Sequence, residues 1–120
     1  MPSVKIESLE GSSPETKAKM ANAIANAIVS VKEANVLKAN VMVTFCDLKE
    51  TDFYAEGSPF RVGISWFEGR SQDVKTKIAQ GVTEGLTSIE EAKLISDAIT
   101  INFTDVKVAD FYKGGKPIKK

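Results

Sequence analysis

The sequence contains no histidine, and its 120 residues include one cysteine and one tryptophan. Without histidine the chain cannot form a Ser-His-Asp or Cys-His catalytic system, and histidine-based zinc sites are excluded. A base that acts near neutral pH must then be a carboxylate or lysine with a shifted pKa, the cysteine, or the α-amino group of the chain. The lone Cys46 cannot form an internal disulfide, and its alternating segment is typical of a packed, unreactive thiol.

The sequence also has neither an excess of one sign of charge nor a long apolar run. Lysine and arginine together number 16, as do aspartate and glutamate, so no net field attracts nucleic acid or an anionic membrane. No apolar run approaches the roughly 20 residues of a membrane span, and the start, MPSVKIESLEG, lacks the hydrophobic stretch of a signal peptide. The carboxylates occur singly, without metal-ligand spacing. We therefore expect one cytoplasmic domain over residues 1–120, without metal, cofactor, nucleic-acid or membrane partners.

What the sequence does contain is a tandem repeat. Shifted against itself by 58 positions it aligns without a gap, and 19 of the 58 pairs between residues 2–59 and 60–117 are identical. A period this long that occurs only twice indicates two fused, similar units rather than a solenoid, which needs three or more repeats.

Each half has the pattern of a strand, a helix and a second strand. Polar and apolar residues alternate from Val4, and Ser13, followed by proline and an acidic first turn, is typical of a helix start that Ser71 repeats. Alternating runs follow from Val41 and Ile99. The apolar stripes at helical spacing comprise Met20, Ile24, Ile28 and Val31 in the first half, and Ile78, Val82, Leu86 and Ile89 in the second.

Such a strand–helix–strand unit predicts a right-handed crossover between two parallel strands. Two units related by a pseudo-twofold axis give an α/β (α+β) fold, with a four-stranded mixed sheet and two helices on one face. Ala23 and Ala27 align with Gly81 and Gly85, which indicates close packing through small residues. The opposite sheet face would be uncovered in a monomer, so we expect an oligomer.

The N-terminus, the turns before the helices and the ends of both halves share short motifs. Pro2 follows the initiator methionine, EGSS lies at 10–13 and EGRS at 68–71, and a lysine lies four residues after each turn serine. Phe-Tyr segments that end at Gly57 and Gly115 predict short hairpins. Together these features resemble the 4-oxalocrotonate tautomerases of the tautomerase superfamily. Short members of that family form hexamers that are trimers of dimers, so the resemblance implies a fused pair of units that assembles as a homotrimer.

Pro2 is the candidate catalytic residue. Methionine before a small residue is normally removed, which would leave Pro2 with a free secondary amine. An α-amino group titrates near ~7.7–8.0, and an apolar pocket beside a cation lowers that pKa, so the amine could act as a general base at neutral pH. The resemblance implies the same role. The alternative is that Pro2 only begins a strand.

The two halves differ where the resemblance places the chemistry. Phe60 aligns with Pro2 in mid-chain, so the second half has no terminal amine; Ser12 aligns with Arg70, so the first half has no turn arginine. In the family, the turn arginine that serves a proline comes from a neighbouring unit. Pro2 with Arg70 would then make one working site per chain, in which Arg70 binds a substrate carboxylate through paired hydrogen bonds. The alternative is a turn arginine that faces water.

The resemblance also implies an apolar pocket wall formed by Phe67 and Phe111, for which plain core packing is the alternative. Trp66 has the parity of Val62 and Ile64, and we interpret it as sheet packing rather than ligand contact.

The sequence departs from the family at a second arginine, which lies on the second strand and grips the substrate. The aligned positions hold Met42 and Thr100, and neither can take this role. Either the substrate is not the family's dicarboxylate, or another donor, such as Arg61 or Asn40, takes the place of the arginine.

Together these residues predict an isomerase, needing no cofactor or metal, that catalyses keto–enol tautomerisation of a small 2-oxo or 2-hydroxydienoate acid. Two alternatives stay open. Relatives that hydrate or dehalogenate haloacrylates use a cationic proline as the acid, with a carboxylate that activates water. The other is a non-enzymatic trimeric module that binds a metabolite or a protein in a decayed pocket.

Overall fold

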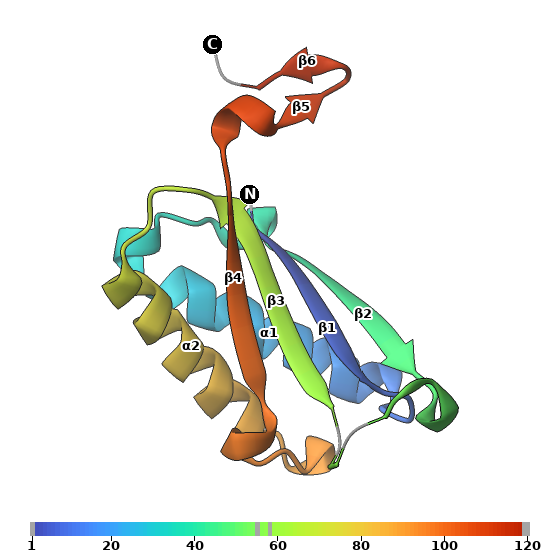
Figure 1. The fold of residues 1–120 in the computed structure, drawn as a ribbon. Helices are drawn as coiled ribbons and strands as arrows, with labels where there is room; N and C mark the ends of the chain where they lie inside the picture. The colour runs from blue at the N-terminus through green and yellow to red at the C-terminus, as the bar shows by residue number, and fades with distance from the viewer. Residues whose placement is uncertain (1, 55, 58, 119–120) are drawn as a thin grey trace.

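The computed structural model of the protein describes residues 2–54, 56–57 and 59–118. A four-stranded sheet has both helices on one face, and a two-stranded hairpin lies beyond it (Figure 1). The helices and strands are β1 (Ser3–Leu9), α1 (Pro14–Ser30), β2 (Met42–Leu48), β3 (Phe60–Phe67), α2 (Gln72–Thr87), β4 (Thr100–Val106), β5 (Tyr112–Lys113) and β6 (Lys116–Pro117). Short 3-10 turns connect them: η1 (Lys32–Ala34), η2 (Lys38–Asn40), η3 (Glu50–Asp52), η4 (Glu90–Ala92), η5 (Ser96–Ala98) and η6 (Val108–Asp110).

The strands of the sheet follow the order β2-β1-β3-β4. Each half contributes one parallel pair, β1 with β2 and β3 with β4, as a β-α-β crossover requires. At the centre β1 and β3 run antiparallel, from Ser3 opposite Ser65 to Ser8 opposite Phe60. The predicted mixed sheet, built from two β-α-β units with both helices on one face, is confirmed.

Both helices begin at the predicted serines. Ser13 and Ser71 each accept a hydrogen bond from the backbone N–H three residues on, at 3.1 and 3.2 Å, and so cap a helix whose first N–H groups have no internal partner. In the turns before them, Gly11 and Gly69 have φ of 125° and 122°, a region that glycine adopts without strain. The second of these turns therefore fixes where Arg70 lies, between Gly69 and the helix cap.

The two helices approach each other closely through their small residues. A Cβ added at Gly85 would lie 3.2 Å from the Cβ of Ala23, and one added at Gly81 would lie 3.3 Å from that of Ala27. The predicted packing through this face is confirmed.

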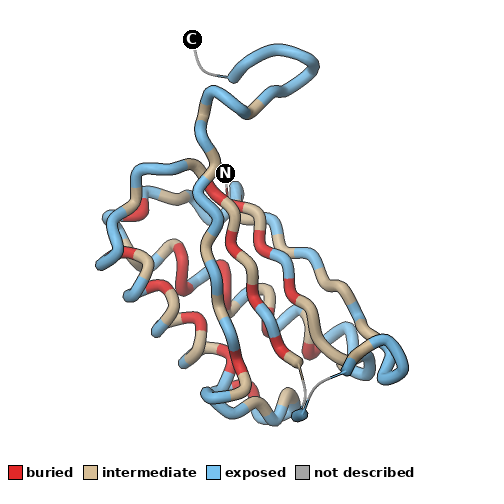
Figure 2. Tube along the Cα trace, viewed as in Figure 1, coloured by how far each residue is buried: buried red, intermediate tan, exposed pale blue. Residues whose placement is uncertain are grey.

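The core lies between the sheet and the helices. Figure 2 shows buried residues alternating along β1 and β3 and recurring along the helices. The predicted helical stripes are buried except at Val31, which is half-buried. The buried residues of the central strands are Val4, Ile6, Phe60, Val62, Ile64 and Trp66. Within the described ranges, no helix has the length and apolar character needed to cross a membrane.

β5 and β6 form the hairpin predicted for the second half, with Tyr112 opposite Pro117. It stands clear of the sheet at the end where β1 begins (Figure 1). In the first half, the corresponding segment contains η3 and no strand at residues 53, 54, 56 and 57. Residues 55 and 58 lie outside the described part of the chain, so the first hairpin stays a prediction.

Candidate active site

Pro2 lies immediately before β1, and its side chain is fully buried. Its carbonyl oxygen accepts a hydrogen bond from the N–H of Met42 at 3.1 Å, which continues the pairing between β1 and β2. Because Pro2 has the parity of the buried Val4 and Ile6, its ring lies on the helix side of the sheet. Met1, whose removal the predicted chemistry requires, lies outside the described residues.

A pocket of about 270 Å³, which we call the Pro2 pocket, opens beside this residue. Three segments form it: the start of β1, the turn after β3, and the connection between α1 and β2. Its lining residues are Pro2, Asn35, Val36, Leu37, Asn40 and Arg70. A single chain thus brings the predicted base from its first half next to the predicted carboxylate ligand from its second half.

Arg70 is held in place by backbone oxygens. Its Nε and Nη2 donate to the carbonyl oxygen of Ala34 at 3.1 and 2.9 Å, and its Nη1 donates to that of Phe67 at 2.8 Å. Its Cζ lies 4.7 Å from the centroid of the Trp66 ring, within cation–π distance. A guanidinium has five N–H groups. One N–H on each terminal nitrogen therefore has no partner among the described residues.

The charge that acts on Arg70 is that of Asp105, which forms an ion pair with Lys75. Burial lowers the pKa of Arg70, and the negative charge of Asp105 opposes this shift. Asp105 accepts hydrogen bonds from Lys75 Nζ at 2.8 Å and from Trp66 Nε1 at 2.9 Å. The hydrogen bond from Lys75 contributes most, and that from Trp66 next, to holding the pKa of the Asp105 carboxyl below its ordinary value. The ion pair thus fixes the indole on which Arg70 stacks.

Trp66 has two roles, of which the sequence predicted one. It is buried and stacks on Phe103 with ring centroids 5.2 Å apart, so the predicted sheet packing is confirmed. Its support of Arg70 was not foreseen. The available signal was that Trp66 and Arg70 align with two serines, Ser8 and Ser12, so both large residues are particular to the same half.

Phe67 and Phe111 lie against each other, edge to face, with ring centroids 5.1 Å apart. Neither is among the residues that line the Pro2 pocket of this chain, although Phe67 supplies a backbone oxygen to Arg70. Their predicted role as a substrate wall stays a prediction. The apolar wall that the chain itself provides is Val36 and Leu37, in an irregular connection whose sequence has no period to mark it.

Of the two candidates for a second donor, Asn40 lines the Pro2 pocket and Arg61 does not. Arg61 Nη2 lies 2.9 Å from Glu7 Oε1 on the uncovered face of the sheet, and this hydrogen bond lowers the pKa of Glu7. Met42, at the position of the family's second arginine, is exposed. Within the described ranges, no three His, Cys, Asp or Glu side chains are grouped so that they could hold a metal ion.

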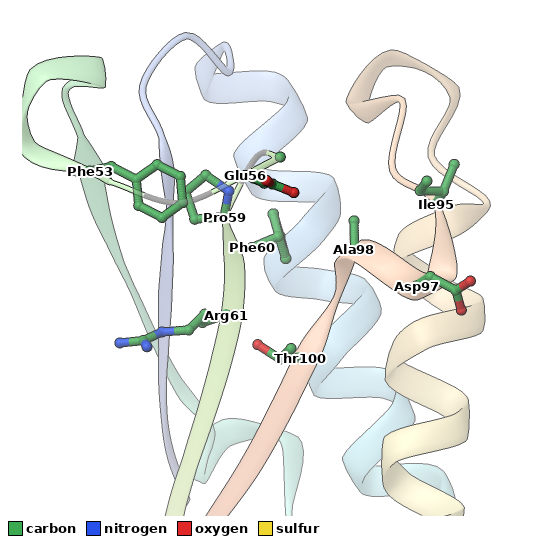
Figure 3. A pocket seen from close by; sticks show the side chains of 10 residues that line it. Phe53, Glu56, Pro59, Phe60, Arg61, Ile95, Asp97, Ala98 and Thr100 are labelled. Atoms are coloured by element: carbon green, nitrogen blue, oxygen red, sulfur yellow. The ribbon is translucent and has the colours of Figure 1, made fainter.

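The pseudo-twofold axis generates a second pocket, which we call the counterpart pocket. Its lining residues Phe60, Lys93, Leu94, Ile95 and Ala98 align with Pro2, Asn35, Val36, Leu37 and Asn40, and Gly57 and Pro59 complete it. Figure 3 shows the adjoining hollow, which shares Gly57, Pro59, Phe60, Ile95 and Ala98 with it and is also lined by Arg61. Neither an arginine nor Ser12, the residue aligned with Arg70, lines the counterpart pocket within the described residues.

Solved structures with the same architecture define the class of fold. F6 fused 4-OT, an asymmetric trimer, matches with a TM-score of 0.83 and 17% identity over 96% of this chain and 94% of its own. Pt0534 inactivated by 2-oxo-3-pentynoate matches with a TM-score of 0.83 and 17% identity over 95% and 93% of the two chains. FG41 malonate semialdehyde decarboxylase inhibited by 3-bromopropiolate matches with a TM-score of 0.78 and 19% identity over 92% and 88%. The chain therefore has the fold of the tautomerase superfamily, in the form of two fused units.

The family follows from the sequence. Residues 1–117 match the model of DUF1904, a domain of unknown function, and the chain belongs to this family. A comparison with curated proteins finds no match. Because the family carries no assigned activity, the function has to be inferred from the superfamily fold and from the residues of the Pro2 pocket.

Proposed function

We propose that this protein is a tautomerase that interconverts the keto and enol forms of a small 2-oxo or 2-hydroxydienoate acid, with the nitrogen of Pro2 as general base after removal of Met1. The observation that supports this most directly is that Pro2 and Arg70, from different halves of the chain, line one pocket. Pro2, whose side chain is buried, would carry the terminal amine, and Arg70 has free N–H groups; these are the two parts that this reaction needs.

In the proposed reaction the Pro2 amine takes a proton from the dienol hydroxyl, or from the carbon acid in the reverse direction. The resulting ammonium returns a proton to the other position, so the substrate gains and loses one proton and no electrons. Arg70 binds the carboxylate through the free N–H groups of its two terminal nitrogens. Its positive charge disfavours a second cation in the same pocket, which favours the neutral, basic form of the amine.

The lining of the pocket favours a base over an acid at Pro2. A hydratase or dehalogenase with a cationic Pro2 needs a carboxylate to activate water, and the described lining residues include none. The likeness to a malonate semialdehyde decarboxylase with decarboxylase and hydratase activities is at 14% identity and concerns the fold. A decayed binding module would not retain Pro2 and Arg70 together, whereas the counterpart pocket has kept the equivalent of neither.

The proposed assembly is a homotrimer, and the F6, R7 and Q0 fused 4-OT proteins, which have the same fold, were solved as trimers. Among the described residues, four of the six large exposed apolar side chains form pseudo-twofold pairs, Leu37 with Ile95 and Tyr54 with Tyr112, whereas Met42 and Ile118 do not. Exposed apolar residues at equivalent places in both halves are what two equivalent contacts with neighbouring chains would need. Because Leu37 also lines the Pro2 pocket, a neighbouring chain seated there would complete its wall.

Ultraviolet-monitored ketonisation of 2-hydroxymuconate and phenylenolpyruvate tests the proposal, with a mass spectrum to establish whether Met1 has been removed. Pro2→Ala replaces the secondary amine by a primary one without the ring, and we expect activity to fall at least about a hundredfold, the scale of a lost general base. Phe60→Leu, a milder change at the buried, aligned residue of the other half, should leave most of the activity. Activity that Pro2→Ala does not alter, or an active protein that retains Met1, would refute the proposal.

A further inference from the structure

The polar groups of the Pro2 pocket are unusual for a site that binds an acid. Among its described lining residues, Arg70 is the one cation, and the other polar side chains are the carboxamides of Asn35 and Asn40. Both asparagines are exposed, and neither carboxamide is hydrogen-bonded to another described residue, so both can reach a ligand. We infer that the pocket selects small 2-oxo acids that bear a single carboxylate, and that Asn40 contacts their oxo or enol oxygen. This inference rests on the proposed function, because it concerns the same pocket.

The geometry of Arg70 limits it to one anion. Three of its five N–H groups are occupied by the backbone oxygens of Ala34 and Phe67. The two that remain, one on each terminal nitrogen, match the two oxygens of one carboxylate. A second carboxylate on the same molecule would need another positively charged group of the pocket to pair with.

Within one chain, the rest of the described lining does not supply that charge. A second carboxylate would lie beside Val36, Leu37 and the two carboxamides, none of which carries a positive charge to pair with it. A carboxamide suits a 2-oxo group instead, because its NH2 can donate to a keto oxygen and its carbonyl can accept from an enol hydroxyl. Asn40 can therefore contact both tautomers without a change of charge.

Two acids with the same five-carbon chain test this selectivity: 2-oxopentanoate, which ends in a methyl group, and 2-oxoglutarate, which ends in a carboxylate. Calorimetric titration of the full-length protein should give a dissociation constant for 2-oxopentanoate at least about tenfold lower than for 2-oxoglutarate, which corresponds to about 1.4 kcal/mol. Trp66, the one tryptophan, lies 4.7 Å from Arg70, so its fluorescence should change with the same dissociation constant. Arg70→Ala should abolish binding of both acids, and Arg61→Ala, at the other arginine of the sequence, should not.

A positive charge introduced into the pocket should weaken the preference for 2-oxopentanoate. Asn40→Arg places a second cation beside Arg70. It should lower the ratio of the dissociation constant for 2-oxoglutarate to that for 2-oxopentanoate at least about tenfold. Ala98→Arg adds the same charge at the aligned position of the counterpart pocket and should leave the ratio unchanged. The inference is overturned if the unaltered protein binds 2-oxoglutarate as tightly as 2-oxopentanoate, if it binds neither, or if Ala98→Arg shifts the ratio as far as Asn40→Arg.

Binding is measured here without turnover, so the inference and the proposed function fail separately. A preference for 2-oxopentanoate in a protein without Pro2-dependent ketonisation would support the selectivity and refute the tautomerase. Pro2-dependent ketonisation with equal binding of the two acids would support the tautomerase and refute the selectivity.

Discussion

Arg70 is held by carbonyl oxygens rather than by a carboxylate, and the choice of partner decides how much of its charge a ligand meets. The oxygens of Ala34 and Phe67 fix the guanidinium through three hydrogen bonds without neutralising it. The nearby carboxylate of Asp105 is instead bound to Lys75 and Trp66. A guanidinium that is oriented but unpaired suits the binding of an anionic substrate, because no internal ion pair has to be broken first.

The Asp105 network also predicts how stability depends on pH. Hydrogen bonds from Lys75 and Trp66 hold the pKa of Asp105 in the folded protein below its ordinary value. As the pH falls, Asp105 therefore takes up its proton near pH ~4 in the unfolded chain and only at a lower pH in the folded protein. The stabilisation is present above that pH and is lost as pH falls further through the lowered pKa. Asp105→Asn should weaken this acid-side loss in the free energy of unfolding, measured by urea denaturation between about pH 3 and pH 6 at fixed chain concentration.

The first half offers a matched control for this experiment. Asp47 is bound to Lys17 at 2.6 Å in the equivalent ion pair, and the position of the tryptophan donor there is Ser8. Asp47→Asn should therefore leave more of the acid-side dependence than Asp105→Asn. An equal effect of the two substitutions would show that the hydrogen bond from Trp66 contributes nothing to the pH dependence.

At the scale of the elements, the approach of α1 to α2 sets the width of the core. Glycine inside a helix costs about 1 kcal/mol relative to alanine, and α2 has glycine at both contact positions while α1 has alanine. The distances of 3.2 and 3.3 Å from an added Cβ to the facing alanines leave no room for a larger side chain. The small residues of α2 are therefore tolerated because they let two capped, amphipathic helices share one sheet face.

Gly85→Leu should destabilise the protein by about 1–3 kcal/mol, the usual cost of overpacking, although leucine is the better helix former. The added side chain would meet Ala23 across the helix interface. Ala23→Gly in the same chain should recover part of the loss, so a double-mutant cycle in urea should give a coupling of at least about 0.5 kcal/mol. Strictly additive effects would mean that these two positions do not share the contact.

The elements could be predicted because their causes are local. Serine caps, apolar stripes and alternating strands can be recognised within a few residues, and the repeat supplied the pairing of the two halves. The contacts of the site arise differently. Arg70 depends on the backbone oxygen of Ala34 in the other half, and the wall at Val36 and Leu37 lies in a connection without periodicity. No local pattern specifies such contacts, so the family resemblance predicted that Pro2 and Arg70 would share a site, with Asn40 as a candidate donor, but not the wall at Val36 and Leu37 or the oxygens that hold Arg70.

For the whole molecule, the pseudo-twofold axis makes two pockets from one repeat, and substitutions have separated their chemistry. The Pro2 pocket has a candidate base, a guanidinium and a carboxamide at Asn40. In the counterpart pocket, Phe60 takes the place of Pro2 and Ala98 that of Asn40, and the cation in its lining is Lys93. Lys93 has a positive φ of 52°, uncommon for a residue of this size, and its aligned residue Asn35 has φ of 55°. The backbone symmetry thus persists while the side chains no longer match.

One small 2-oxo acid should therefore bind per chain, although the fold offers two related pockets. A calorimetric titration with 2-oxopentanoate at a chain concentration several times the dissociation constant should saturate at one equivalent. Arg70→Ala should remove this binding because it deletes the guanidinium of the Pro2 pocket. Lys93→Ala should leave the binding intact because Lys93 lines the counterpart pocket and not the Pro2 pocket. Two equivalents in the unaltered protein, with one lost in each variant, would show that the counterpart pocket also binds the acid and that duplication has given this chain two anion sites rather than one.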